Sequence, residues 1–492
     1  MLLLLFLLLS PSVIAEDENG LQCRNTTAHL SREQRTQRTA IQLALDAAVR
    51  FRDHFLHAQD AAAAAAASAG SDCAELSEST VQQLDRCLHP SSTRSDLQTW
   101  LSAALTNLQT CRTGYAELNV SIPPFLHSLT NVSELIRNSL AAVAARGELG
   151  EKKSSGEFPE WTCTDGRALI RALQRDVAED YVVAKDGTGD FSNISGAVDA
   201  AVSNRQNTSR RLLIYVKEGV YEEYVSINAA NLTLIGDGIG KTVITGNRSV
   251  VGGPGDLTTF NTATVAIQGE FIIARGITFR NTAGPENHQA VALRCQADFA
   301  VFYQCSFEGY QDTLYVHSNR QFFRECDVYG TIDFIFGNAA AVLQKCNIYP
   351  RRPMGDQRNT VTAQGREDLS ENTAFAFQNC KVTAAPDLAP VQRMVKTYLG
   401  RPWKKYSRTV VMESCLDSLI APEGWLEWNE NGDAVNTLFY GEYKNTGPGS
   451  NTSGRVKWPG YKNLTEHDAS MFTVKSLIDG GSWLPATGVP FD

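Results

Sequence analysis

The sequence predicts an all-β parallel β-helix preceded by an all-α four-helix bundle. Short strand-like runs rich in β-branched and aromatic residues fill the chain beyond Tyr181, and no amphipathic helix separates them. Two of these runs contain Cys305 and Cys326 at matching places, 21 residues apart. A repeat of that length is about one coil of a stacked β-solenoid. The preceding part is rich in alanine and leucine at helical spacing, which indicates packed helices.

The helical part extends from residue 31 to residue 147. Its first helix begins at the capping-box sequence "SREQ", at Ser31, and is expected to end near Gly70. Short connections between four helices favour an antiparallel bundle. The other three helices are expected over residues 72–88, 96–118 and 123–146.

The chain then becomes polar and rich in Gly, Ser and Lys over residues 147–160, which is typical of a linker. A doubly wound sheet would need helices between its strands and a sandwich would show hairpin turns, so the strands that follow favour the β-helix. The expected strand segments are "YVVAKD", "RLLIYVKEGVY", "LTLIGDG", "FIIARGITFRNT", "FAVFYQCSF", "RQFFRECDVY", "AVLQKCNIYP", "AFAFQNCKV" and "RTVVMESC".

The first residues, "MLLLLFLLLSPSVIA", are apolar over a stretch too short to span a bilayer, which predicts a secretory signal peptide. Eleven cysteines and several N-x-S/T sites fit a secreted, extracellular glycoprotein. The net charge of −9 argues against nucleic acid as a partner, and no later stretch suits a membrane. We expect a signal peptide over residues 1–15, a helical region over 16–148, a linker over 149–177 and a β-helix domain over 178–492.

Two aspartates point to an active site. Asp312 and Asp333 each follow a cysteine by seven residues, in "CSFEGYQD" and "CDVYGTID". Equivalent positions in neighbouring coils lie about 4.8 Å apart, so the sequence predicts two carboxyl groups almost in contact. Two acids that close cannot both ionise easily, so one keeps a proton while the other stays charged. An anionic nucleophile beside a neutral acid indicates an enzyme.

The cysteines divide along the same line as the domains. Cys305 with Cys326, and Cys346 with Cys380, occupy similar strand contexts and are candidate pairs between coils. Another candidate pair would join two helices, through Cys73 and Cys111. For the five remaining cysteines, the spacing indicates no partner: Cys23, Cys87, Cys163, Cys295 and Cys415. Because their number is odd, at least one of them must be a free thiol.

Six strings beyond Asp180 resemble plant pectin methylesterases in order and spacing. They are "EGVYEEYV", "QAVALR", "GYQDTLYVHSNRQFF", "GTIDFIFGNAAAV", "YLGRPWKKYSRTVVM" and "GSWLPATG". The helical part is similar to the inhibitor-like pro-region of the long form of that family, notably in "CAELSESTVQQLDRC" and "WLSAALTNLQTC". It departs from the family pattern in its first region, where an early pair of cysteines is reduced to Cys23.

The resemblance implies a right-handed parallel β-helix that de-esterifies methylated homogalacturonan in the plant cell wall, without metal or cofactor. It implies that Asp333 is the nucleophile and that Asp312 is a general acid and then a base. The remaining roles that it implies are oxyanion donors at Gln289 and Gln311, an orienting cation at Arg401, and substrate contacts at Trp403 and Thr259.

Ester hydrolysis needs a nucleophile, a proton donor for the alcohol and donors for the oxyanion, and the residues supply each. A guanidinium beside Asp333 would keep it ionised. Aromatic side chains would offer flat faces to sugar rings, at Tyr315, Phe336, Trp403 and Trp428. Phe334 is expected in the core, and His317 on the surface or in a loop.

Other functions remain open at this point. A retaining glycosidase also uses two carboxylates about 5 Å apart, and the chain could instead be an inhibitor or binding protein with an inactive solenoid. The sequence lacks G-x-S-x-G and H-E-x-x-H, which disfavours serine esterases and zinc hydrolases. We expect a monomer that binds methyl-esterified homogalacturonan, with inhibitor proteins and a processing protease as partners. The expected processing site is "RALI" at 167–170, whereas "RRLL" at 210–213 opens a strand.

Overall fold

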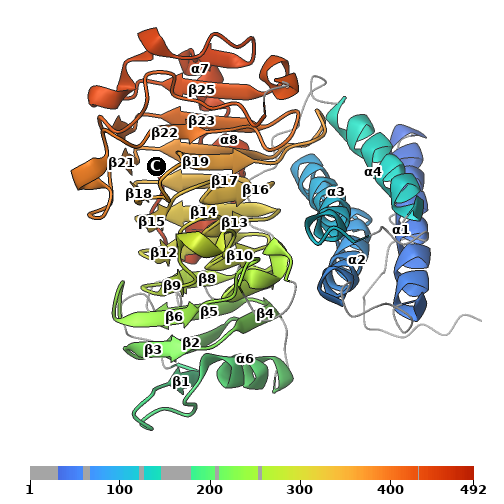
Figure 1. Cartoon of the computed structure of the whole chain (residues 1–492). Coiled ribbons are helices and arrows are strands. Elements are labelled where there is room, and N and C mark those ends of the chain that lie inside the picture. The colour runs from blue at the N-terminus through green and yellow to red at the C-terminus, as the bar shows by residue number, and fades with distance from the viewer. Residues whose placement is uncertain are drawn as a thin grey trace, which may run out of the picture.

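The computed structural model describes residues 32–58, 67–120, 127–145, 179–204, 210–252, 257–429 and 432–492. A bundle of helices stands along one side of a tall stack of strands (Figure 1). The expected signal peptide, the linker with "RALI", Cys23 and Cys163 lie outside the described residues. No helix of the described part is long and apolar enough to cross a membrane.

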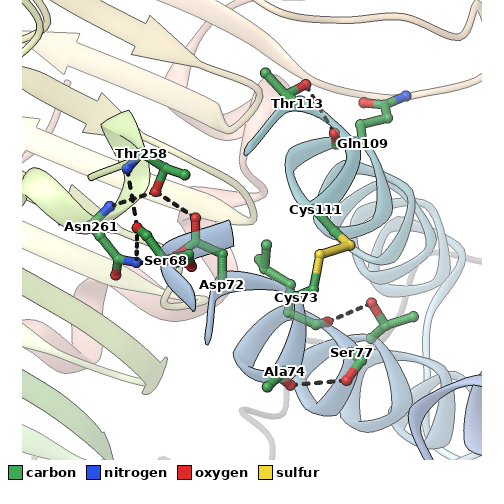
Figure 2. Close-up of a disulfide and its surroundings, with 12 residues drawn as sticks. Ser68, Asp72, Cys73, Ala74, Ser77, Gln109, Cys111, Thr113, Thr258 and Asn261 are labelled. Atoms are coloured by element: carbon green, nitrogen blue, oxygen red, sulfur yellow. Dashed lines mark hydrogen bonds between the residues drawn. A yellow bond between two sulfur atoms is a disulfide. The ribbon is translucent and has the colours of Figure 1, made fainter. Parts of the chain in front are cut away.

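The bundle consists of α1 (Arg32–Ala58), α2 (Ala67–Cys87), α3 (Arg94–Glu117) and α4 (Ser128–Ala144). The expected break near Gly70 is wrong, because Gly70 lies inside α2, where it is buried. A buried glycine permits close helix packing at a cost of about 1 kcal/mol in helix propensity, so it need not end a helix. The expected disulfide between Cys73 and Cys111 is present and joins α2 to α3, with 4.7 Å between the Cα atoms (Figure 2).

The strands form a parallel β-helix with three sheets, which confirms the predicted fold. From β2 to β25, consecutive strands belong to different sheets, and each strand pairs in parallel with its equivalent one coil away. One 11-stranded sheet, sheet A, contains β1 (Tyr181–Val183), β2 (Leu212–Val216), β5 (Leu232–Gly236), β8 (Ile273–Arg275), β11 (Ala300–Tyr303), β14 (Arg320–Arg324), β17 (Ala340–Gln344), β20 (Ala374–Gln378), β23 (Arg408–Met412), β25 (Phe439–Tyr443) and β26 (Tyr461–Asn463).

The other two sheets form the remaining two sides of the coils. The eight-stranded sheet B contains β3 (Gly219–Glu222), β6 (Thr242–Gly246), β9 (Thr278–Asn281), β12 (Ser306–Glu308), β15 (Asp327–Gly330), β18 (Asn347–Pro350), β21 (Lys381–Val382) and β24 (Cys415–Leu416). The seven-stranded sheet C, which faces the bundle, contains β4 (Val225–Ala230), β7 (Val265–Glu270), β10 (Leu293–Cys295), β13 (Leu314–Val316), β16 (Ile335–Gly337), β19 (Asn359–Gln364) and β22 (Thr397–Gly400).

Short helices close the ends and one side of the stack. At the N-terminal end, α6 (Ile194–Ser203) buries its apolar face against the first coils. The C-terminal segment carries α7 (Glu466–Ser470), α8 (Val474–Leu477) and α9 (Gly480–Trp483), and its apolar side chains pack with the outer face of sheet A. The loop before β7 holds a single turn of 3-10 helix, η6 (Thr259–Thr262).

The interior of the coils is apolar and stacked. Phe302 and Phe323 occupy equivalent positions in neighbouring coils, and their rings stack with centroids 4.8 Å apart. Phe334 is fully buried, as predicted. Such in-register stacks bury large apolar side chains on every coil, which is the main source of stability in a solenoid.

The predicted disulfides Cys305–Cys326 and Cys346–Cys380 are wrong, because all four cysteines are free and buried. The strand register places them at one rung of four successive coils, just before β12, β15, β18 and β21. In-register rungs keep Cβ atoms near the coil spacing of about 4.8 Å, whereas a disulfide needs about 3.8 Å. Each thiol donates instead to a backbone carbonyl, as Cys326 does to Phe302 at 3.3 Å.

Candidate active site

A cavity of about 180 Å³ lies between sheet C and the bundle. The β-helix side of its lining includes all ten residues that the sequence singled out as catalytic or substrate-binding: Thr259, Gln289, Gln311, Asp312, Tyr315, Asp333, Phe336, Arg401, Trp403 and Trp428. These residues come from widely separated parts of the sequence, so the coil register gathers them at one place.

Asp312 and Asp333 are positioned by the same turn in consecutive coils. The pairing of Leu314 with Ile335 in sheet C puts the two aspartates at equivalent places. Both have left-handed backbones, with φ of 61° and 51°, a conformation that aspartate and asparagine tolerate better than most residues. The turn therefore points both carboxyl groups into the one cavity.

Asp333 accepts a fork of hydrogen bonds from a guanidinium. Arg401 Nε donates to Asp333 Oδ1 at 2.8 Å, and Arg401 Nη2 donates to Oδ2 at 2.7 Å. The hydroxyl of Thr360 donates to Asp333 Oδ1 at 2.7 Å. Such bidentate charge-assisted bonds fix the carboxylate plane as well as its charge. The Arg401 guanidinium also lies 4.3 Å from the ring centroid of Trp428.

Asp312 has the opposite character. Burial and then the charges of Asp333 and Glu117 hold the pKa of Asp312 well above its ordinary value, although Arg401 pulls it down. The protonated form of Asp312 is therefore favoured beside the ion pair of Asp333 with Arg401. The carboxyls of Asp312 and Asp333 thus differ in their surroundings, because one is buried near other acids and the other is paired with a guanidinium.

Amides and aromatic rings complete the floor of the cavity. Within the described residues, the side-chain amides of Gln289 and Gln311 line the cavity without a hydrogen-bond partner, so they are free to donate. Tyr315 and Phe336 stack with centroids 4.1 Å apart, and Trp403 meets Phe336 edge-on at 6.1 Å. The arrangement joins a carboxyl paired with a guanidinium, a second carboxyl of raised pKa, side-chain amides and flat apolar faces.

The bundle forms the opposite wall, which the sequence did not predict residue by residue. The apolar side chains of the bundle and of the cavity floor form one continuous buried cluster. The cavity lining contributed by α2 and α3 consists of Asp72, Thr110, Thr113, Gly114 and Glu117. A polar stripe at helical spacing on α3 was the available signal, since it runs along one face of the helix.

Specific polar bonds attach the bundle to the β-helix. Thr106 accepts from Asn338 Nδ2 at 2.8 Å, and the Glu117 carboxylate accepts from the Thr259 amide at 2.9 Å. The Thr110 hydroxyl lies 2.9 Å from Nε2 of His317. His317 lies in the loop between β13 and β14, as one of its two expected locations had it, but it is fully buried there, so the expected surface location is wrong. The reason is that the bundle covers this face of the coil.

A buried ion network anchors the first turns of α3. Arg320 of β14 pairs with Asp298 at 2.7 Å and with Asp96 of α3 at 2.8 Å. Asp298 also accepts from the Trp100 indole at 2.8 Å and pairs with Arg86 of α2 at 3.3 Å. Burial works against the charge of Asp298, but these partners outweigh it and hold its pKa below the ordinary range.

Comparison with known proteins identifies relatives of both parts. Residues 180–481 match the family model described as pectinesterase, and residues 21–142 match the plant invertase/pectin methylesterase inhibitor model. A probable pectinesterase/pectinesterase inhibitor 17 of Arabidopsis thaliana is 54% identical over 429 residues, which cover 86% of this chain and 81% of the relative. Pectinesterase 2 of Citrus sinensis is 54% identical over 430 residues, with the same shares covered.

Solved structures match the β-helix part. Pectin methylesterase from carrot is 51% identical with a TM-score of 0.62, and the match covers 64% of this chain and 98% of the carrot chain. A pectin methylesterase solved in complex with a hexasaccharide is 25% identical with a TM-score of 0.52, and the match covers 63% of this chain and 99% of that one. The carrot chain thus corresponds almost entirely to the β-helix part of this one.

Proposed function

The chain belongs to the pectinesterase family and carries an inhibitor-like bundle ahead of its esterase part, and from this premise we propose how it hydrolyses the methyl esters of homogalacturonan. The Asp333 carboxylate attacks the C6 carbonyl carbon of a methylated galacturonate. The carbonyl electron pair moves to oxygen, and the amides of Gln289 and Gln311 donate to that oxyanion. One such donor is typically worth roughly 3–4 kcal/mol of barrier.

Collapse of this tetrahedral intermediate breaks the bond to the methoxy group. Asp312 gives its proton to the departing oxygen, and methanol leaves. An acyl anhydride now joins Asp333 to the sugar. Asp312, which is now an anion, takes a proton from water as that water attacks the acyl carbon, and Asp333 departs as a carboxylate. The products are methanol and a galacturonic acid, which loses its proton to water to become galacturonate, and both aspartates regain their starting protonation states.

One observation carries this mechanism: a carboxylate clamped by Arg401 beside an equivalent aspartate whose pKa is well above the ordinary value. Two neighbouring carboxyl groups without other donors would equally suit a glycosidase. The side-chain amides of Gln289 and Gln311, which have no hydrogen-bond partner among the described residues, favour acyl transfer, because they match an oxyanion rather than an oxocarbenium ion.

For the decisive measurement, the full chain is first folded and then cut at a specific protease site inserted within residues 149–177. The bundle is removed, and the activity of the separated β-helix is measured. On methylated pectin we expect methanol release without new reducing ends. Reducing ends appearing in step with incubation time, with no methanol, would establish a glycosidase instead.

We infer that the bundle blocks the enzyme until it is removed. Support comes from α2 and α3, which close the cavity with Asp72, Gly114 and Glu117 among its lining. The reduced cysteine pattern of the first region does not alter these contacts, which lie in α2 and α3. The proposed sequence of events is secretion to the cell wall, cleavage by a processing protease between the two parts, and action as a monomer on pectin. Separate inhibitor proteins of the same family would then be able to occupy the vacated face.

Attachment of the bundle should weaken as pH rises. Asp72 is buried, accepts from the hydroxyl of Thr258 at 2.5 Å and also accepts from Asn261 (Figure 2). Burial raises the pKa of Asp72 to about 7. Because this pKa is higher than in the free bundle, attachment takes up a proton. That contribution is complete below pH about 4 and declines as pH rises to about 7.

The measurement is the dissociation constant between the separated bundle and β-helix at several pH values between about 4.5 and 7.5. The carboxyls of Glu117, Glu270 and Asp312 also have raised pKa values and act in the same direction. His317 opposes them, because burial lowers its pKa. Asp72→Asn serves as the comparison and should flatten the profile. An equally steep profile in that variant would exclude Asp72 as a source of the pH dependence.

A further inference from the structure

One rung of sheet C continues from the aromatic floor of the cavity to a guanidinium. Arg294 of β10 pairs in register with Tyr315 of β13, which pairs with Phe336 of β16. Equivalent positions in successive coils are about 4.8 Å apart. The Arg294 backbone therefore stands one coil beyond the stacked rings, on the side toward the N-terminal end of the stack.

Arg294 is braced by its neighbours yet not fully satisfied. Its guanidinium carbon lies 3.3 Å from the ring centroid of Phe260, which itself lines the cavity. Stacking on an aromatic face leaves the N–H groups of arginine free to donate in the plane. Among the described residues, the buried Nε of Arg294 has no hydrogen-bond partner. The Nε–H group of Arg294 is thus an unused hydrogen-bond donor beside the cavity.

A carboxylate of the bundle occupies this guanidinium in the uncut chain. Arg294 Nη1 donates to Oε1 of Glu75 at 2.7 Å, and Gln296 Nε2 donates to the same oxygen at 3.0 Å. Arg294 and Gln296 belong to the β-helix, whereas Glu75 belongs to α2. Removal of the bundle therefore uncovers two donors that are already placed around one carboxylate.

We propose that Arg294 and Gln296 form a subsite for a free galacturonate carboxylate near the ester being hydrolysed, and that Glu75 occupies this subsite in the uncut chain. The inference rests on the proposed function. Each sugar of the polymer carries one carboxyl group, either esterified or free. A free carboxylate forms charge-assisted bonds with a guanidinium, and a methyl ester forms only weak neutral ones. The released enzyme should therefore prefer esters next to sugars that are already de-esterified.

The test compares two hexamers of galacturonate, one fully methylated and one partly methylated, with the cut and separated enzyme. Arg294→Gln should raise KM for the partly methylated hexamer about tenfold, which corresponds to the loss of about 1.4 kcal/mol of binding from a charge-assisted hydrogen bond. The fully methylated hexamer should show a rise of less than about threefold. Arg294→Lys should retain part of the preference. The matched control is Lys381→Gln, which removes the same charge from an exposed site in sheet B.

Equal KM changes on both hexamers would overturn the subsite while leaving the esterase intact. No methanol from the parent enzyme with either hexamer would contradict the proposed function itself. A second measurement covers misfolding of the Arg294 variant. Trigalacturonate should displace the separated bundle from the parent β-helix, and a bundle with Glu75→Gln should be displaced at about tenfold lower concentration. Failure of trigalacturonate to compete would also overturn the subsite.

Discussion

Replacing Asp333 with asparagine is expected to lower the rate of methanol release by at least about 10⁴-fold, the range seen when a covalent nucleophile is lost. An amide cannot form the acyl intermediate, and it leaves the Arg401 fork without its anion. Asparagine suits the position structurally, because it tolerates the left-handed backbone of Asp333, with φ of 51°. Methanol release by the separated enzyme under substrate saturation is the measurement.

The fold of this variant must be checked separately, because Arg401 loses a charged partner. Thermal unfolding should show a loss of no more than about 3 kcal/mol, the cost of an unpaired partly buried charge. Asp312→Asn is the companion variant, since it removes the proposed proton donor and spares the proposed nucleophile. Methanol release by Asp333→Asn at even a tenth of the parent rate would exclude Asp333 as the nucleophile.

Replacing Gly114 with leucine is expected to raise methanol release by the uncut chain about tenfold. Gly114 is buried in α3 beside Thr258 of the β-helix. A Cβ there would lie 3.2 Å from Cγ2 of Thr258 and 3.4 Å from Oδ2 of Asp72. Those contacts are already tight, so a leucine forces α3 away from η6. Overpacking of this kind costs about 1–3 kcal/mol, and a tenfold shift toward the open form needs about 1.4 kcal/mol.

Ala116→Leu is the matched control, because Ala116 lies two residues away in α3 and is exposed. It should leave methanol release by the uncut chain unchanged. Once both variants are cut and the bundle is removed, their activities should equal that of the parent. If Gly114→Leu stayed as inactive as the parent while its bundle remained folded, blocking of the cavity by α3 would be refuted.

The two aspartates of the candidate site could be predicted because their proximity follows from the number of residues between them. Asp312 and Asp333 share a place in a 21-residue coil, and the pairing of Leu314 with Ile335 reproduces that register. Parallel in-register coils convert sequence offset directly into spatial proximity. Arg401 and Gln289 were found through the family resemblance, since no periodicity links them to the aspartates.

Sheet C was harder to foresee, although it carries the cavity floor. Its strands β13 and β16 have three residues each, too few for a strand pattern. Their residues are buried on both faces, by the core inside and by the bundle outside, so polar and apolar positions do not alternate. The same cover explains the error at His317. The sequence gives no indication of which face a second domain will shield.

The cysteine errors have a related cause. Cys305 and Cys326 do lie at equivalent positions of adjacent coils, as their similar strand contexts predict. The predicted proximity is therefore correct, but the predicted disulfide is wrong. Sequence offset sets the distance between backbones, but a covalent bond also needs Cβ atoms that converge. Cys73 and Cys111 meet that condition because they face each other across two helices.

The free thiols inside the coils make the two parts of the protein respond differently to a reducing environment. Within the described chain, the covalent crosslink belongs to the bundle, and the cysteines of the β-helix are unlinked. A reductant is therefore expected to destabilise the bundle and to leave the β-helix unchanged. Closing a loop of this length stabilises a fold by roughly 3–4 kcal/mol, so thiol–disulfide balance acts on the inhibitor-like part and not on the esterase part.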